Sequence, residues 1–285
     1  MKNDPVSRTA KESRSGGELC SGFPCPVILK FTKACDSQKL PEGITVPMAD
    51  IQGTNCYCDE EAGQEIEARL AQLPLTTVHF LDSGNYHYLT YFWMRQIRVP
   101  FRLVLFDHHT DMQAPALGEI LSCGGWVRDA VRDLPMLREI WLIGPEESAF
   151  AQAEEKVRLL THYISAEALS AGTANTDTLV EKLIADFQDS TLPVYFSVDK
   201  DILRPEDAVT NWDQGNVELS LLLAMLNRLT GICAKNRIPA LGADICGEED
   251  DLDEQSGSQA SAVNEKANRA IAELFLKTWA TKENG

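Results

Sequence analysis

The chain has 285 residues, 44% of them hydrophobic, and carries 26 Lys and Arg against 43 Asp and Glu, for a net charge of -17. This hydrophobic fraction is ample for a packed core, so the composition excludes a globally disordered chain. The acidic balance argues against nucleic-acid and anionic-membrane partners, because both require basic surfaces. It mildly favours a cationic substrate or a metal ion.

The start of the chain predicts neither a secretory signal nor a membrane anchor. Residues 1–24 are expected to form a flexible tail, and residues 1–18 are polar and rich in Ser, Lys and Arg, with no apolar run of the kind that a secretory signal requires. The most apolar stretch, 221–226, soon meets Asn227 and Arg228, so we expect a core helix there rather than a membrane span. Cytoplasmic residence is the default expectation.

The eight cysteines predict neither a disulfide framework nor a zinc module. A cytoplasmic chain of this size rarely uses disulfides, so we expect buried free thiols. The spacings of Cys20 and Cys25, and of Cys56 and Cys58, do not match the paired C-x-x-C pattern of a structural zinc site.

From residue 27 onwards, apolar runs alternate with helical patterns. This alternation predicts βαβ units and a mostly parallel sheet with helices on both faces. Residues 37–57 have the composition of an irregular connection, and nothing suggests a repeat or a linker, so we expect a single domain over 25–285. The expected strands are 27–31, 77–81, 103–106, 139–143, 162–165, 194–198 and 240–245. The expected helices are 60–73, 88–97, 118–131, 148–160, 178–186, 220–234 and 262–282.

The run 104–111 (VLFDHHTD) is an apolar stretch that ends abruptly in carboxylates and imidazoles. A buried parallel strand has this pattern, and open α/β sheets place their chemistry at the carboxyl ends of such strands. Residues two apart on an extended strand end share a face. We therefore expect Asp107, His109 and Asp111 to point into one cleft and His108 to point away.

The run 194–201 (VYFSVDKD) repeats the pattern, with Asp199 and Asp201 at its end. A lone Asp-x-Asp at a strand end is often only a helix cap or a turn. Two such motifs, each after an apolar strand, favour a divalent-metal centre. Mixed carboxylate and imidazole ligands suit Mn, Zn or Fe better than Mg or Ca, and two ions about 3.5–4 Å apart can activate a shared water.

These two motifs resemble those of a known family. Residues 106–111 (FDHHTD) resemble the D-x-H-x-D element of the arginase/agmatinase/formiminoglutamase superfamily, and residues 197–205 (SVDKDILRP) resemble its S-x-D-x-D-x-L-x-P element. Their order, spacing and strand contexts match, and the resemblance extends roughly from residue 27 to the C-terminus. It implies a three-layer α/β/α sandwich with a mainly parallel sheet of about eight strands.

The resemblance also implies a hydrolase with two manganese ions, for which zinc or iron could substitute. Such an enzyme cleaves C–N bonds of guanidino, formimino or related small substrates by attack of metal-bound hydroxide. Carried over by position, Asp107 and Asp199 bridge both ions, Asp111 completes one site, and His109 with Asp201 completes the other. Asp201 could also hydrogen-bond the nucleophile.

Two positions differ from the family in the machinery itself. Where the family has Gly-Gly-Asp-His, residues 82–87 read DSGNYH, so an ungapped alignment puts Tyr86 at the ligand position. We favour His87 as the ligand, because imidazole is the better donor and a local bulge is cheap. Cys123 falls where arginases keep a proton-shuttling histidine; it is a candidate ligand, acid/base group or nucleophile. His108 and His87 are the other candidate proton donors.

Two further candidates concern the substrate. Glu248 stands one residue after the position at which the family's glutamate binds a guanidinium. Asn211 lies in the segment 210–215 (TNWDQG), which lacks the family's Gly-Thr-Gly pattern. The acidic run that begins at Glu248 is expected to form a solvated loop or a rim that attracts cations.

Two other functions stay open. A mononuclear zinc amidohydrolase of the histone-deacetylase type shares the fold and uses only Asp107, His109 and Asp199, although the presence of Asp111 and Asp201 speaks against it. A metal-binding or regulatory protein without catalysis is the second. The expected partner is a small-molecule substrate, with no nucleic acid and no membrane; a homo-oligomer stays open.

Overall fold

The structure is a computed structural model that describes residues 25–280 except 116–117, 171–172 and 251–253. The flexible tail expected over 1–24 therefore lies outside the described residues. Among the described residues, none of the helices combines the length and the apolar character needed to cross a bilayer.

The core of the molecule is one eight-stranded sheet in which every pairing is parallel, in the order β2-β1-β4-β10-β9-β5-β7-β8. The prediction of a mainly parallel sheet of about eight strands is confirmed. A separate two-stranded ribbon pairs β3 with β6 in antiparallel fashion. The strands are β1 (Val27–Lys30), β2 (Ile44–Pro47), β3 (Tyr57–Cys58), β4 (Val78–Phe80), β5 (Phe101–Phe106), β6 (Leu121–Ser122), β7 (Leu137–Ile143), β8 (Thr161–Ile164), β9 (Val194–Asp199) and β10 (Ala240–Cys246).

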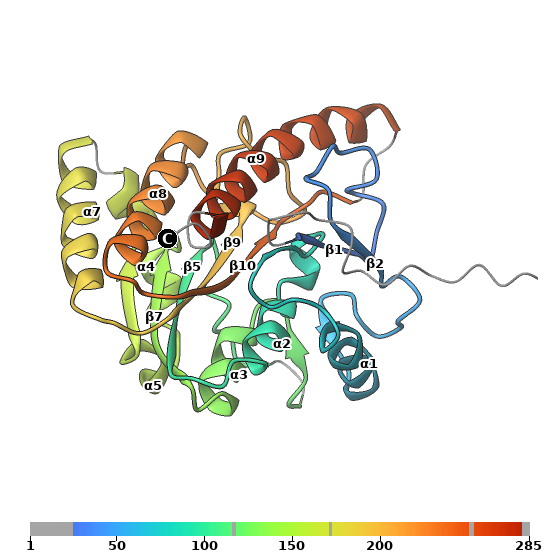
Figure 1. Ribbon diagram of the computed structural model, residues 1–285, viewed down its shortest axis with the longest axis horizontal. Helices are drawn as coiled ribbons and strands as arrows, with labels where there is room; N and C mark the ends of the chain where they lie inside the picture. The colour runs from blue at the N-terminus through green and yellow to red at the C-terminus, as the bar shows by residue number, and fades with distance from the viewer. Residues whose placement is uncertain (1–24, 116–117, 171–172, 251–253, 281–285) are drawn as a thin grey trace, which may run out of the picture.

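Helices cover both faces of the sheet, so the molecule has three layers (Figure 1). Figure 1 shows α7, α8 and α9 on one side and α1, α2 and α3 on the other. The helices are α1 (Glu60–Leu70), α2 (Leu89–Arg95), α3 (Trp126–Asp133), α4 (Glu147–Phe150), α5 (Glu155–Arg158), α6 (Ala166–Ser170), α7 (Thr173–Gln188), α8 (Leu219–Lys235) and α9 (Glu254–Ala280), with 3₁₀ turns η1 (Gly84–Tyr86) and η2 (Lys200–Ile202).

The central strands are buried on both faces. In β5, Val104 and Phe106 pack into the core beneath α7, α8 and α9, while Leu103 and Leu105 pack into the core beneath α1, α2 and α3. A strand with two buried faces has a continuous apolar sequence. Residues 101–106 accordingly do not alternate between apolar and polar, and Arg102 is their single polar residue.

Three parts of the fold differ from the sequence-based expectation. The segment 37–57 contains the edge strand β2, whose residues are only partly buried and so give a weak pattern. The helix expected over 118–131 begins only at Trp126, because Leu121–Ser122 pairs with β3. The helix expected over 148–160 is two short helices, α4 and α5.

The cysteine prediction holds in part. Six cysteines of the described residues are free thiols, five of them buried. The prediction is wrong for Cys25, which is disulfide-bonded.

Strand order brings four strand ends together. Strands β4 and β5 follow each other among the sheet strands along the chain but are not neighbours in the sheet. The later strands β10 and β9 lie between them. The carboxyl ends of β4, β10, β9 and β5 are therefore neighbours. Open α/β sheets bind their ligands where the strand order changes in this way.

Candidate metal centre

Asp107 and Asp199 are placed side by side by the register of the sheet. Phe106, the last residue of β5, pairs with Val198 of β9, so the two carboxylates that follow leave adjacent strands at the same level. Each also shapes the turn after it: Asp107 Oδ1 accepts from His109 N over 2.6 Å, and Asp199 Oδ1 accepts from Asp201 N over 3.0 Å. In both residues the other oxygen, Oδ2, lies near His87 Nδ1.

These turns replace the extended geometry expected for both motifs. Strand β5 ends at Phe106, and Lys200–Ile202 forms the 3₁₀ turn η2. Asp111 reaches the cleft from a left-handed backbone conformation, with φ of 52°. Such a conformation is rare for a non-glycine residue. Trp126 Nε1 donates to Asp111 Oδ2 over 2.5 Å and holds this carboxylate in the cleft.

His87 lies at the centre of the first group of possible ligands. Its Nδ1 is 3.3 Å from Asp107 Oδ2, 3.0 Å from Asp111 Oδ2 and 3.4 Å from Asp199 Oδ2. Tyr86 points elsewhere, because its ring stacks on Phe31 with centroids 4.1 Å apart. Of the two alternatives at this position, it is His87 that faces the carboxylates.

A second group adjoins the first. His109 Nδ1 is 2.7 Å from Asp201 Oδ2 and 3.7 Å from Asp107 Oδ1. Each group offers three ligand atoms within 4.8 Å of one another, namely from His87, Asp107 and Asp199, and from Asp107, His109 and Asp201. Because Asp107 belongs to both, the two groups are contiguous, and each could hold a metal ion.

The electrostatics of the cleft fit divalent cations. Burial raises the pKa of both Asp199 and Asp201, and neighbouring carboxylates raise them further. Burial lowers the pKa of His109, but Asp107 and Asp201 outweigh it and raise this pKa to about 12. Asp107 Oδ2 is buried and accepts no hydrogen bond. The mixed set of carboxylate and imidazole donors suits manganese or a related ion.

A buried chain of hydrogen bonds orients His87. Its Nε2 lies 2.9 Å from Ser197 Oγ, and Ser197 Oγ donates to Asp244 Oδ1 over 2.5 Å. Thr90 Oγ1 donates to the other oxygen, Asp244 Oδ2, over 2.9 Å. Since the serine hydroxyl gives its proton to Asp244, it accepts from His87 Nε2, and Nδ1 is left free to bind a metal. Such supporting partners are typical of histidine ligands in metal sites.

Glu248 is placed away from the cavity and is occupied by other partners. Its carboxylate forms an ion pair with Lys200, whose side chain is fully buried. Lys200 stands between Asp199 and Asp201 in the sequence. Asn268 Nδ2 donates to Glu248 Oε1 over 2.6 Å. Gln38 Nε2 and Asn264 Nδ2 donate to Glu248 Oε2 over 2.7 and 3.0 Å. We therefore no longer propose Glu248 as a substrate contact.

The other candidates have mixed positions. Cys123 lines the cavity, and burial together with the charge of Asp111 raises the pKa of its thiol, so the protonated form is favoured. His108 does not line it; its backbone N donates to Asp201 Oδ1 over 2.9 Å, and its buried Nδ1 has no hydrogen-bond partner. Asn211 is exposed and bonded to Asp250 through its side chain.

The metal-site cavity has a volume of about 220 Å³. Its walls come from the two ligand groups, from the β3–β6 ribbon and from the segment after η2. It is lined by Cys56, Tyr57, Gly84, Asp107, His109, Asp111, Gln113, Ser122, Cys123, Gly124, Asp201 and Trp212.

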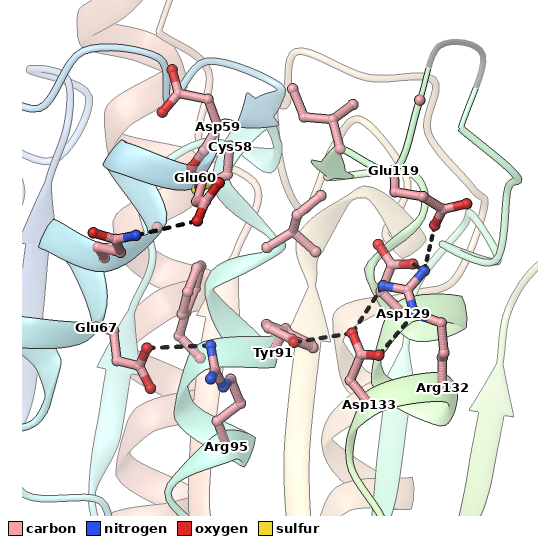
Figure 2. A pocket seen from close by; sticks show the side chains of 16 residues that line it. Cys58, Asp59, Glu60, Glu67, Tyr91, Arg95, Glu119, Asp129, Arg132 and Asp133 are labelled. Carbon is pink, nitrogen blue, oxygen red and sulfur yellow. Dashed lines mark hydrogen bonds and ion pairs between the residues drawn. The ribbon is translucent and has the colours of Figure 1, made fainter.

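A second, larger hollow of about 670 Å³ lies on the other face of the ribbon, where Cys58 and Leu121 line it (Figure 2). Both of its arginines pair with acidic side chains, as the dashed lines in Figure 2 show. Arg95 is 3.2 Å from Glu67, and Arg132 is ion-paired with three carboxylates, those of Glu119, Asp129 and Asp133. Neither ligand group includes a residue of this hollow, so the candidate active site is the smaller cavity.

Sequence reasoning missed the residues that support the ligands. Ser197 is the first residue of the second motif, and its position two before Asp199 was a usable indication. Asp244, Thr90 and Trp126 gave no comparable indication, because only the fold brings them to the cleft.

The comparisons with known proteins bear on the family and the fold. A family model described as the arginase family matches residues 44–269. An uncharacterised protein of Thermotoga maritima is 34% identical over 241 residues, which cover 83% of this chain and 85% of that protein.

Solved structures share the fold at low sequence identity. Proclavaminate amidino hydrolase of Streptomyces clavuligerus is 19% identical, with a TM-score of 0.64 over 93% of this chain and 94% of that one. Formimidoylglutamase of Bacillus subtilis is 14% identical, with a TM-score of 0.61 over 95% and 97%. Arginase of Bacillus caldovelox is 15% identical, with a TM-score of 0.60 over 89% and 98%.

Ser197→Ala tests the orientation of His87. Without the hydroxyl, Nε2 has no acceptor and the ring is free to turn, so we expect the affinity for Mn²⁺ to fall roughly 10–100-fold in calorimetric titration. Thr90→Val is the matched control, because it removes a bond one step further out and should cost less. Wild-type affinity in Ser197→Ala would contradict the role given to this chain.

Lys200→Met tests the buried ion pair. It leaves the Glu248 carboxylate buried without its counter-charge, so we expect the free energy of unfolding in urea to drop by roughly 3–5 kcal/mol. The double variant Lys200→Met/Glu248→Leu removes both charges and should regain part of this loss. Equal stability of the single variant and the wild type would count against the pair.

Proposed function

Because the chain belongs to the arginase family, we propose that it is a hydrolase that uses two divalent ions, manganese by preference, to cleave C–N bonds of guanidino, formimino or related small compounds. The observation that supports this most is the pair of ligand groups that share Asp107. A site for a single ion needs only one such group. If the groups had only a structural role, neither of them would need to border a cavity.

In this proposal each side chain keeps the place that the geometry gives it. His87, Asp107, Asp111 and Asp199 would hold one ion, and Asp107, His109, Asp199 and Asp201 the other. When bound, two such ions supply Lewis-acid activation of a water and of the substrate's C–N group. The chain's own groups hold the ligands in register and form the walls of the small cavity.

Position relative to the cavity supports one candidate for the proton donor to the leaving amine. Cys123 lines the cavity next to Asp111 as a neutral thiol, whereas His108 lies outside the lining. Of these two, we propose Cys123 for this step. Asp201 stays the candidate for a hydrogen bond to the attacking water, because it borders the cavity through its contact with His109.

Two rivals make different predictions in one assay. A deacetylase-like zinc enzyme would release acetate from acetylated amines with Zn²⁺, and a non-catalytic metal-binding protein would be silent on every substrate. Release of amine or urea from guanidino and formimino compounds with Mn²⁺ would support the present proposal. The retained second ligand group, with Asp201 and His109, is the observation that favours it.

The remaining parts of the proposal concern the setting of the enzyme. We propose a single domain over 25–285, a cytoplasmic location and a small-molecule substrate with a cationic reacting group. Family members often form oligomers, and a homo-oligomer is compatible with everything described.

Asp107→Asn tests the shared ligand. Because Asp107 belongs to both groups, we expect the content of tightly bound manganese to fall from about two ions per chain to almost none. We also expect kcat/KM to drop by roughly a thousand-fold or more. Asp111→Asn should mainly weaken one ion. Asp129→Asn, at a mostly buried carboxylate of the second hollow, is the control and should keep both. Full loading of Asp107→Asn would contradict the proposal.

A further inference from the structure

The indole of Trp212 stands at the metal-site cavity in a fixed position. Its Nε1 donates to Asn85 Oδ1 over 3.0 Å, and Asn85 Nδ2 in turn donates to Asn55 Oδ1 over 2.9 Å. The ring meets the imidazole of His109 nearly edge-on, with centroids 5.9 Å apart and an interplanar angle of 73°. A tryptophan held in this way beside a possible metal ligand is positioned to contact whatever enters the cavity.

Gly84 lets the indole come this close. A Cβ atom at Gly84 would lie 2.7 Å from Trp212 Cδ1 and 3.5 Å from Asp199 Oδ2. The ring therefore packs against the backbone of η1 at the edge of the first ligand group. Trp212 nevertheless keeps 39% of its surface exposed, so part of the ring remains accessible to a ligand.

The remaining walls of the cavity are uncharged. Outside the two ligand groups and Asp111, the described residues that line it contribute thiols, hydroxyls, one amide, glycine backbone and two aromatic rings. The lining therefore offers a charged end of a substrate no opposite charge other than the ligand carboxylates. Removing a charge from water without such a partner is unfavourable.

Glu248, the carboxylate expected to grip a cation, is bound elsewhere. Lys200 and three side-chain amides hold both of its oxygens in the protein interior. Turning Glu248 towards the cavity would leave the fully buried Lys200 without a counter-charge. A charged clamp is thus not available from this residue.

We infer that the substrate is a small guanidine or amidine whose non-reacting end is uncharged, and that Trp212 selects this end by packing against it. The inference rests on the proposed hydrolase function. The cavity of about 220 Å³ is below the roughly 300–1,000 Å³ of pockets for drug-sized ligands, so it suits a small compound.

The test is a series of guanidines with matched tails, assayed with the manganese-loaded protein. Propylguanidine has an uncharged tail, 3-guanidinopropionate an anionic one, agmatine a cationic one and arginine a zwitterionic one, while guanidine itself has none. We expect kcat/KM for propylguanidine to exceed that of each charged compound at least about tenfold. The affinity of the same compounds is measured separately by calorimetry.

Variants of Trp212 connect this preference to one side chain. In Trp212→Ala, the ratio of kcat/KM for propylguanidine to that for guanidine should fall at least about tenfold, through KM rather than kcat. Trp212→Phe should restore part of the ratio. Asn85→Ala releases the indole from its position and should lower the ratio less than Trp212→Ala.

The outcomes separate this inference from the proposed function. Preferred turnover of arginine, agmatine or 3-guanidinopropionate overturns the inference and leaves the hydrolase standing. No turnover of any compound, with propylguanidine still binding tightest in a Trp212-dependent way, overturns the hydrolase and supports the inference. No turnover and no ranking of affinities overturns both.

Discussion

Mutual repulsion of buried carboxylates is the constraint on which the rest of the site depends. Asp107, Asp111, Asp199 and Asp201 are each at most 5% exposed and meet at the ends of two adjacent strands. Ionised carboxylates gathered in this way are costly without positive charge in their midst, since removing charges from water without partners is unfavourable. The fold does not relieve the repulsion by separating the groups. It holds them in place with turn hydrogen bonds and with Trp126, and leaves a cradle that divalent ions suit.

The same constraint explains the surroundings of the cleft. A free carboxylate for substrate binding would add a fifth negative charge next to four others. Lys200 neutralises the charge of Glu248 by forming an ion pair with it. In the sequence, Lys200 stands between Asp199 and Asp201, two of the candidate ligands. The pair also ties η2 to α9 through Asn264 and Asn268, so the last helix of the chain stabilises the loop that carries Asp199 and Asp201.

Local sequence was sufficient for those parts of the fold and site that depend on one segment. An apolar run that ends in acid predicts a buried strand and its charged end, and this held for β5 and β9. It was insufficient where distant segments decide. Whether Tyr86 or His87 enters the cleft depends on the 3₁₀ turn η1 and on the stacking of Tyr86 with Phe31. The fate of Glu248 depends on Lys200, and the helix expected from 118 is shortened by pairing with β3.

The uncharged walls of the metal-site cavity are consistent with the cluster of carboxylates at its base. In the proposed function, a cation bound in the cleft would satisfy the carboxylates of the two ligand groups, so these would not serve as partners for a charged tail. Recognition of the tail then has to rely on shape and apolar contact, which a rigid aromatic ring provides with little loss of conformational freedom. The contacts from Asn85 and Gly84 fix the indole of Trp212 before any ligand arrives. In such a site we expect selectivity to come from a preorganised apolar surface. A charged side chain placed to bind the tail would also interact with the metal ions and their carboxylate ligands.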